Sequence, residues 1–409
     1  MLISYTLYII ISITILSFVL GVENISVYYS NYGNYFQMKA NICKHNLILP
    51  FIVDISSTAT FFSDLLEEYV KDFQHTAPGT TKYNNEYITV TIIVDFIRIG
   101  VRNVKYHFFY LPKTSKYKVN SIGLGYGTMN TDYSLIHQLY YQGGIDSMVF
   151  TIETLGNVGG VIHFGNYIND KLNTLPYTAQ CKVQMFIGIW SCYINDVYLY
   201  NNNKHFQLNN TNNLFVLSTT QYGYTFPQEF IDFMYANVFQ IYFNKQICKE
   251  INHEITLKTI HKEILCNKTQ FQIDNNNNNN NIVFHIDNVN FILTQNDLFN
   301  CSNLMCSFIF QVNNNTSIRN EYRNHITWIF GTKYISSKTY ITFNQNNQSI
   351  TFTSTTPILL SHMRNITIKP SSSTITQPTI GLGLVLPSAI WASSKARRIY
   401  ISCSRFSIS

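Results

Sequence analysis

The sequence predicts an all-β fold with a few short helices, because of its composition and the spacing of its apolar residues. Only 12% of the 409 residues are charged, whereas aromatic residues reach 15%. Asn, Ser, Thr and Tyr take the place of the missing charges, and these residues favour turns and strands over exposed helices. The length is about two to three times that of a usual domain, which is enough for one large core or two smaller ones.

Short segments that alternate between apolar and polar residues recur along the chain and predict β-strands. The clearest examples are residues 87–94, 160–164, 196–200 and 282–286. The best helix candidates are short and span residues 133–141 and 227–237. An uninterrupted run of Asn at 275–281 is too polar to pack in a core, and we expect it to be a surface loop insertion.

The charge pattern and the glycine and cysteine spacings exclude several classes of function. The net charge of +6 comes from 28 basic and 22 acidic residues that are scattered along the chain. Because nucleic-acid binding needs clustered basic patches, we expect no nucleic acid as a partner. No Cys-x-x-Cys pair occurs, and the glycines after Ile122 are too few for a phosphate-binding loop. We therefore predict no metal and no cofactor.

The amino-terminal segment indicates the compartment. Residues 2–21 are uncharged and mostly apolar, and they end at the small residue Gly21. The pattern predicts a secretory signal peptide over residues 1–21; an uncleaved signal anchor is the alternative, because about 19 apolar residues can just span a bilayer. A membrane is a partner only if this segment stays uncleaved. We expect the chain in the secretory pathway, either outside the cell or in the lumen of an endomembrane compartment.

Eight cysteines follow the apolar segment, and an even number permits disulfides in an oxidising compartment. Asn-x-Ser/Thr sequons are concentrated from Asn209 onward. They predict a glycosylated second half of the chain.

Two apolar strands each end in a polar residue followed by hydroxyls. The first delivers Asp54, and the second delivers Ser218. Taken alone, Asp54 is more simply a turn or helix-cap residue. The order and spacing of the surrounding segments favour another interpretation.

Across nearly all of the lumenal chain, these segments resemble the pepsin-like, or plasmepsin-like, aspartic proteases. Val53-Asp54-Ile55-Ser56-Ser57-Thr58 is similar to the family's first Asp-Thr-Gly-Ser-Ser motif, and Ser218-Thr219-Thr220 occupies the place of the second Asp-Thr-Gly. The most specific resemblance is the succession of helix, strand and glycine hairpin at 139–145, 149–152 and 159–165.

The resemblance implies a bilobal fold of two β-barrel-like lobes with a cleft between them. We expect the N-terminal lobe over residues 24–178 and the C-terminal lobe over residues 179–409, with the Asn-rich insertion at 275–281. Leu382-Gly383-Leu384 is similar to the family's closing Leu-Gly-Asp element, and Arg398-Ile399-Tyr400-Ile401-Ser402 is similar to its last strand.

The resemblance also implies which residues form the site. Asp54 matches the first catalytic acid, and Ser218 stands at the position of the missing second acid. Tyr83 falls where the flap tyrosine lies over the cleft; otherwise it is an ordinary exposed strand tyrosine. Ser57 and Thr219 belong to the same cleft.

For the cysteines, the resemblance implies one disulfide in the C-terminal lobe, between Cys266 and Cys306, with Cys301 as a rival partner. Cys181 and Cys192 are close enough in sequence to clasp a hairpin across the lobe junction. The family does not usually have that bridge, so this pairing is a separate hypothesis.

The departures from the family pattern bear on the reaction. Pepsin-like enzymes use two facing carboxylates that share one proton. Here Ser218 replaces the second carboxylate, and no Asp or Glu occurs between Asp196 and Glu229. We interpret the chain as a secreted, catalytically silent homologue, a monomer whose cleft holds an extended peptide. The alternatives are an active aspartic-type endopeptidase with an atypical site built on Asp54, and an unrelated secreted all-β glycoprotein.

Overall fold

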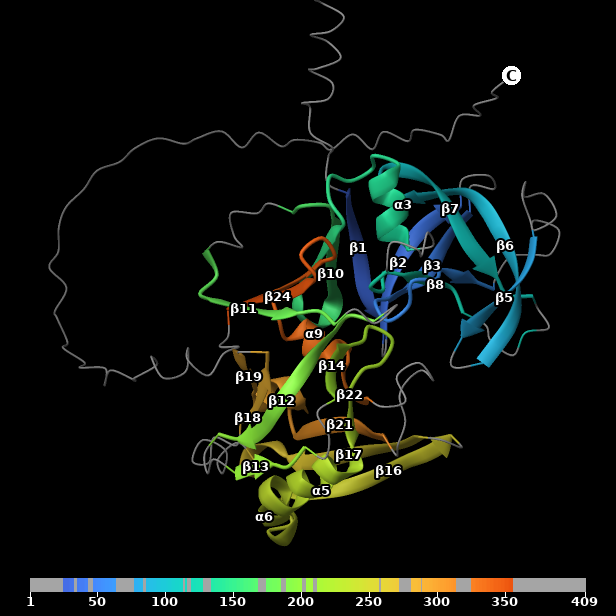
Figure 1. Cartoon of the computed structure of the whole chain (residues 1–409). Coiled ribbons are helices and arrows are strands. Elements are labelled where there is room, and N and C mark those ends of the chain that lie inside the picture. Colours follow the sequence, from blue (N-terminus) through green and yellow to red (C-terminus); the bar gives the residue numbers. More distant parts are fainter. Residues whose placement is uncertain are drawn as a thin grey trace, which may run out of the picture.

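The computed structural model of the chain consists of two large β-sheets and a few short helices (Figure 1). It describes residues 25–32, 35–42, 47–63, 77–83, 86–112, 115, 119–127, 134–167, 174–184, 189–200, 204–208, 212–256, 259–271, 281–287, 289–313 and 325–355. The predicted all-β class is confirmed.

Thirteen strands form the first sheet, and they come from both ends of the described chain. They are β1 (Ile25–Tyr32), β2 (Tyr35–Ile42), β3 (Leu47–Asp54), β4 (Phe61–Phe62), β5 (Ala77–Tyr83), β6 (Glu86–Ile99), β7 (Arg102–Tyr110), β8 (Ser121–Gly123), β9 (Val149–Thr154), β10 (Gly159–Phe164), β11 (Tyr177–Lys182), β23 (Tyr340–Asn344) and β24 (Ser349–Ser354). Their order in the sheet is β11-β24-β23-β9-β10-β1-β2-β3-β8-β4-β7-β6-β5.

Part of this sheet closes into a barrel. β2 pairs with β3 on one side and, through Asn41 and Ile42, with β6 on the other. The ring β2-β3-β8-β4-β7-β6 is thereby complete, and closure leaves these strands without a free edge. Phe36, Val53 and Ile93 are completely buried in its core. Val53 directly precedes Asp54, so packing in this core anchors the strand that carries the acid.

Eleven strands form the second sheet. They are β12 (Ser191–Leu199), β13 (Lys204–Phe206), β14 (Asn213–Leu217), β15 (Tyr224–Pro227), β16 (Cys248–Thr256), β17 (Thr259–Asn267), β18 (Ile282–Ile286), β19 (Val289–Leu293), β20 (Asn300–Cys301), β21 (Met305–Asn313) and β22 (Ile326–Phe330). Their order is β16-β17-β21-β15-β22-β14-β12-β18-β19, with β13 beside β12 and β20 beside β21.

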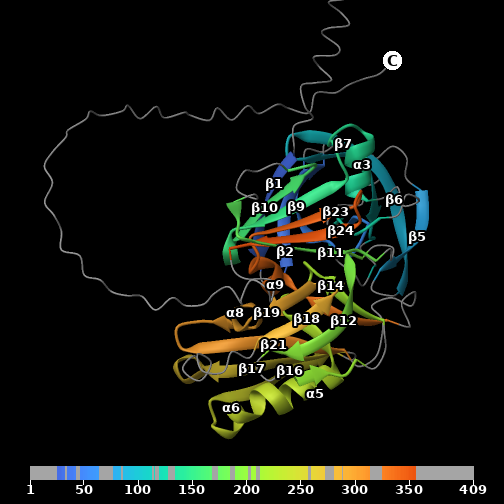
Figure 2. The same cartoon turned by 60° about the vertical axis from the view of Figure 1, so that its left-hand side comes forward.

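The last two described strands return to the first sheet and join the two halves of the molecule. β23 pairs with β9, and β24 pairs with β11, as Figure 2 shows for the red strands beside the green ones. Phe343 of β23 stacks on Phe150 of β9 at 4.6 Å, and Trp190 packs edge-on against both rings. The indole nitrogen of Trp190 donates to the carbonyl of Leu124 over 2.8 Å, which ties this layer to the loop after β8.

The helices are few and short among the described residues. They are α3 (Leu135–Tyr141), a 3-10 turn (Gly156–Val158), α5 (Gln228–Met234), a π-helical turn (Tyr235–Phe239), α6 (Gln240–Asn244), α8 (Gln295–Leu298) and α9 (Thr332–Ser336). Both predicted helices are present, α3 within 133–141 and α5 from residue 228 onward. Within the described part of the chain, none of these helices has the length and apolarity needed to cross a membrane.

Three disulfides connect the described strands. Cys181 of β11 is bonded to Cys192 of β12, which confirms the bridge inferred from their spacing and links the two sheets. The expected pairing of Cys266 with Cys306 is wrong. Cys266 is bonded to Cys248, which lies directly opposite it on β16. Cys306 is bonded to Cys301, which lies directly opposite it on β20.

Some of the sequence-based expectations concern residues outside the described ranges. These are the amino-terminal apolar segment, most of the Asn run (residues 275–280), Cys43, Cys403 and everything after residue 355. Asn281, at the end of the run, is described: it is buried, and its carbonyl accepts from the Tyr200 amide over 2.9 Å.

Candidate functional site

Asp54 is the last residue of β3, at the point where the barrel wall turns. β3 runs parallel to β8, with Asp54 opposite Gly123. A Cβ atom on Gly123 would lie 2.6 Å from the carbonyl oxygen of Ala59, so only glycine fits there. The amide of Leu124 donates to the Asp54 carbonyl over 2.8 Å, and these contacts fix the backbone on both sides of the acid.

The Asp54 side chain is half-buried and bonded to the turn that follows it. Its Oδ1 accepts from the Ser56 amide at 2.8 Å and from the Ser56 hydroxyl at 2.5 Å. Ser57 shapes the same turn, because its Oγ accepts from the Ala59 amide over 3.2 Å and its carbonyl accepts from Gly125 over 2.7 Å. Ser57 therefore supports the loop that carries the acid.

Ser218 lies in a second loop of the same construction. It follows β14, which runs parallel to β22, and its amide donates to the Phe330 carbonyl over 3.0 Å. Gly331 plays the part of Gly123: a Cβ atom there would lie 2.3 Å from the Gly223 carbonyl oxygen. β22 and Gly331 lie beside β14. Residues 382–384, expected as the closing element, lie outside the described ranges, so that expectation stays a prediction.

The hydroxyl of Ser218 occupies the position that Asp54 Oδ1 has in the first loop. It accepts from the Thr220 amide at 3.3 Å and lies 3.0 Å from the Thr220 hydroxyl. In each loop, a side-chain oxygen is thus bonded by the amide and the hydroxyl of the residue two positions later. The two loops therefore share the same pattern of hydrogen bonds. The first loop has a carboxylate at this position, and the second has a hydroxyl.

Thr219 connects the two loops directly. It is completely buried, and its hydroxyl donates to the Val53 carbonyl and accepts from the Ile55 amide over 3.2 Å. Ile55, at the matching position of the first loop, carries no hydroxyl that could return this contact. The loops therefore meet through one threonine, which brings Asp54 and Ser218 to the same junction between the sheets.

Tyr83 ends β5, in the hairpin that β5 forms with β6. Its backbone is paired with Glu86, directly at the turn. The hairpin is an edge of the first sheet and continues the barrel strand β6. The placement of the Tyr83 side chain lies outside what the structure describes, so its expected role as the flap tyrosine stays a prediction.

Comparison with protein families matches the model named "Eukaryotic aspartyl protease" to residues 77–355, more than half of the chain. The chain belongs to the eukaryotic aspartyl protease family. The matched residues include Ser218 and begin after Asp54. A search of curated proteins finds no match to this aspartyl protease family member.

Solved structures show the same fold. The crystal structure of aspartic proteinase from Irpex lacteus is similar with a TM-score of 0.57 and 13% sequence identity. The match covers 82% of this chain and 98% of that one. At 13% identity, this similarity shows a shared fold.

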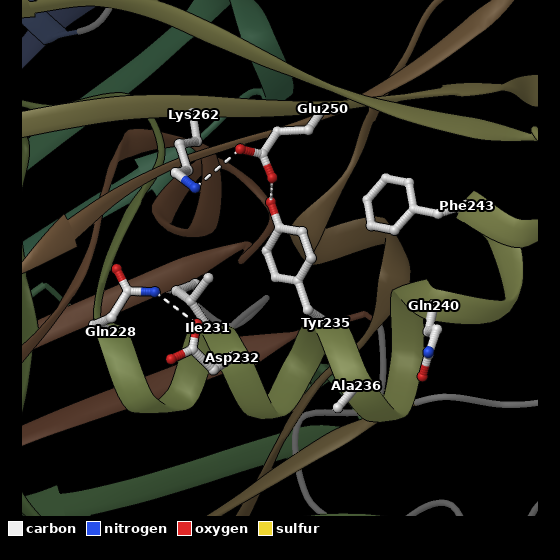
Figure 3. Close-up of a pocket in the computed structure, with 9 residues that line it drawn as sticks. All are labelled: Gln228, Ile231, Asp232, Tyr235, Ala236, Gln240, Phe243, Glu250 and Lys262. Carbon is white, nitrogen blue, oxygen red and sulfur yellow. Dashed lines mark hydrogen bonds and ion pairs between the residues drawn. The ribbon is translucent and has the colours of Figure 1, made fainter.

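This member of the family also has a pocket on its second sheet, well away from β3 and β8 in Figure 1; Figure 3 shows the pocket in close-up. The pocket has a volume of about 490 Å³ and lies between the α5–α6 segment and the hairpin β16–β17. Its lining residues are Gln228, Ile231, Asp232, Tyr235, Ala236, Gln240, Phe243, Glu250 and Lys262.

The polar groups of this pocket bind one another. Figure 3 shows Glu250 between Tyr235 and Lys262: the Tyr235 hydroxyl donates to one carboxylate oxygen, and the Lys262 ammonium lies 2.9 Å from the other. Burial, followed by the hydrogen bond to Glu250, raises the pKa of Tyr235. The phenol of Tyr235 therefore stays protonated near neutral pH.

Among the described residues, no group of three or more His, Cys, Asp and Glu side chains is placed to hold a metal ion. The candidate site is therefore the junction of the Asp54 and Ser218 loops. Reasoning from the sequence identified both loops, but it missed the hydrogen bonds of Thr219 across the junction. The one signal in the sequence was Ile55, which stands where the family motif has a threonine. Without a hydroxyl at this position, only Thr219 of the second loop can make the side-chain contact.

Proposed function

We propose that this member of the aspartyl protease family is a catalytically silent, peptide-binding homologue. The observation that carries the proposal is the hydroxyl of Ser218 at the position that corresponds to the Asp54 carboxylate, with the same hydrogen-bond partners around it. Asp54 is the counterpart of the family's first catalytic acid. Ser218 takes the place of the second.

The family reaction depends on two carboxylates. One is ionised and takes a proton from the attacking water, while the other is neutral and polarises the peptide carbonyl. A serine hydroxyl can orient a water but cannot share an acidic proton with Asp54. Catalytic groups that act as a unit lose a factor on the order of 10⁴ to 10⁶ in rate when one is removed.

The surroundings of Asp54 support the same proposal. The family's glycine two residues after the acid is replaced by Ser56, whose hydroxyl bonds to Asp54 Oδ1 at 2.5 Å. This hydroxyl competes with a water for the same carboxylate oxygen. Thr220 repeats the arrangement in the second loop.

Peptide binding does not need the second acid. The pepsin-like fold binds peptide substrates in the cleft between its lobes, and an extended segment is recognised there through its backbone and through pockets for alternate side chains. The β5–β6 hairpin that ends at Tyr83 is the flap of this proposal. Its partner is an extended peptide or protein segment, bound by a monomer.

The three disulfides fit an oxidising compartment, and pepsin-like aspartic proteases with disulfides are typical of secretory or extracellular proteins. We propose that residues 1–21 act as a signal peptide and that sequons of the second half carry glycans. Asn267, Asn300 and Asn347 are exposed or partly exposed sequon positions among the described residues.

The test is incubation of the purified lumenal protein with a diverse peptide library between about pH 3 and pH 7, where a carboxylate dyad titrates. An Asp54→Ala variant is the matched control. We expect peptides to be retained by both proteins and cleaved by neither. Cleavage by the natural protein that Asp54→Ala and a statine-type inhibitor both abolish would instead identify an atypical endopeptidase.

A further inference from the structure

Four cysteines of the second sheet form one transverse row. Cys248 of β16 lies directly opposite Cys266 of β17, Cys266 lies opposite Cys306 of β21, and Cys306 lies opposite Cys301 of β20. The row crosses four neighbouring strands; Figure 2 shows β16, β17 and β21 side by side. The outer two pairs are the disulfides, each with a Cα–Cα distance of 4.0 Å.

The middle pair is also placed to form a disulfide. In an antiparallel sheet, a residue with a strand on each side forms a closely spaced pair with the residue opposite on one strand and a wider pair with the residue opposite on the other. The Cα atoms of the wider pair are about 5.5 Å apart. Because Cys248–Cys266 and Cys301–Cys306 are of the close kind, Cys266 and Cys306 form a wide pair between them. A separation of about 5.5 Å is within the usual range for a disulfide.

The row runs from solvent into the core. Cys301 is exposed on a two-residue edge strand, whereas Cys306 and Cys266 are completely buried and Cys248 is 6% exposed. The third disulfide differs in both respects, since Cys181 and Cys192 are both buried and the described strands place no further cysteine opposite either of them. It serves as an internal reference.

We propose that Cys301 is a site of S-thiolation by a low-molecular-weight monothiol, and that re-pairing of Cys306 with Cys266 makes this modification possible. This inference is independent of the proposed function. It follows from the order of the four cysteines across the sheet.

The chemistry is two thiol–disulfide exchanges with no net oxidation or reduction. The monothiol loses its proton and attacks the sulfur of Cys301, an exposed residue; the Cys301–Cys306 bond breaks, and Cys306 leaves as a thiolate. That thiolate attacks the sulfur of Cys266, the Cys248–Cys266 bond breaks, and Cys248 leaves as a thiolate that takes up a proton. Two disulfides and one thiol enter, and two disulfides and one thiol result.

The first test uses the intact, disulfide-bonded chain and reduced glutathione. After incubation at graded concentrations, free thiols are alkylated in acid and the peptides are mapped without reduction. We expect glutathione on Cys301, a Cys266–Cys306 cross-link and alkylated Cys248, at concentrations that leave Cys181–Cys192 intact. Alkylated Cys306 beside an intact Cys248–Cys266 bond would overturn the proposal, and so would a Cys301–Cys306 bond that outlasts Cys181–Cys192.

The second test needs no added thiol. In a Cys248→Ser variant, the Cys266 thiol stands next to the Cys301–Cys306 bond, and exchange transfers the free thiol to Cys301. We expect a polar maleimide to label Cys301 in the folded protein at least about tenfold faster than it labels Cys181 in a Cys192→Ser control, because an exposed thiol ionises more readily than a buried one.

A variant Cys301→Ser gives the same test from the other end of the row, should Cys248→Ser fail to fold. There, the Cys306 thiol attacks Cys266, and after unfolding and mapping the free thiol is expected on Cys248. Labelling that remains on Cys266 in the first variant, or on Cys306 in the second, contradicts exchange along the row.

Discussion

Asp54 is the last residue of β3 and Ser218 directly follows β14, and these two strands are built into their sheets in the same way. Each strand has a parallel neighbour with a glycine at its end: β8 ends at Gly123, and Gly331 directly follows β22. No side chain fits at either glycine. Each side chain is bonded by the residue two positions later. The comparison teaches that this loop geometry does not require a carboxylate, because backbone contacts and hydroxyls hold it.

The two loops differ in what lies behind them. Behind the first, the Thr60 hydroxyl bonds to the Tyr106 hydroxyl at 2.9 Å and accepts from the Gly123 amide at 3.1 Å, all without charge. Behind the second, Tyr224 donates to the carbonyl of Asp297, whose carboxylate is paired with the Lys338 ammonium at 2.7 Å. The buried ion pair is therefore found on the Ser218 side, and the contacts on the Asp54 side are uncharged.

Restoring the second acid is the change that tests the comparison most strongly. A Ser218→Asp variant should cleave extended peptides in acid, with a rate on the order of 10⁴ above that of the natural protein. Ser218→Asn has the same shape without a shared proton and should stay inactive. Activity is measured on a quenched fluorescent peptide; a folded Ser218→Asp variant without activity, also in combination with Thr220→Gly, would show that more than the acid has been lost.

Breaking the buried ion pair should have the largest effect on stability. Lys338 and Asp297 have side chains exposed by only 0% and 5%. A Lys338→Met variant leaves the carboxylate uncompensated, and we expect a loss of about 3 to 5 kcal/mol in the free energy of unfolding by urea. Adding Asp297→Asn should return part of that loss; if it does not, the charge of Asp297 is not the cause.

The same pair predicts an acid limit for the second half of the molecule. Burial raises the pKa of Asp297, but Lys338 and the hydrogen bonds outweigh it, so the pKa in the folded state is lowered. Its stabilising contribution is therefore complete above the ordinary pKa of about 3.9 and is lost as the pH falls through the lower folded value. Unfolding free energies between about pH 2 and pH 5 measure this, with the double variant as control.

The contact between the loops is expected to have a smaller effect. Thr219→Val keeps the shape but leaves the Val53 carbonyl and the Ile55 amide without this partner, which costs at least about 2 kcal/mol, because each buried group left unpaired costs roughly 1 kcal/mol or more. Thr220→Val, at an exposed position, should change stability by less than about 1 kcal/mol. Equal effects in the two variants would mean that Thr219 does not hold the junction.

The smallest effect concerns the first half of the molecule near neutral pH. His163 is buried, with Glu153 at 2.9 Å; burial lowers its pKa, and Glu153 opposes that only in part. The unfolded chain therefore binds more protons below about pH 6.5, so stability should fall as the pH drops below that value. His163→Gln should flatten the dependence between about pH 5 and pH 7.5; an unchanged slope would assign it to other groups.

The strand pattern and the motif order predicted the fold class, both helices and the two loops from the sequence. Local signals sufficed there, because apolar alternation sets which face of a strand is buried. They did not show which strand lies beside β14. Phe330-Gly331-Thr332 carries an apolar–glycine signal like that of 382–384, and its parallel pairing with β14 appears only in the structure.

The sequence by itself determined that Ser218 stands where an acid is expected and that no other Asp or Glu is near it in the chain. The tertiary structure decided which cysteines are bonded, because the register of β16, β17, β21 and β20 places the four sulfurs in one row. It also decided that Lys338 is buried beside Asp297 and that Thr219 bonds to Val53. Such contacts join residues 41 to 166 positions apart, and no local pattern in a sequence records a distance across a fold.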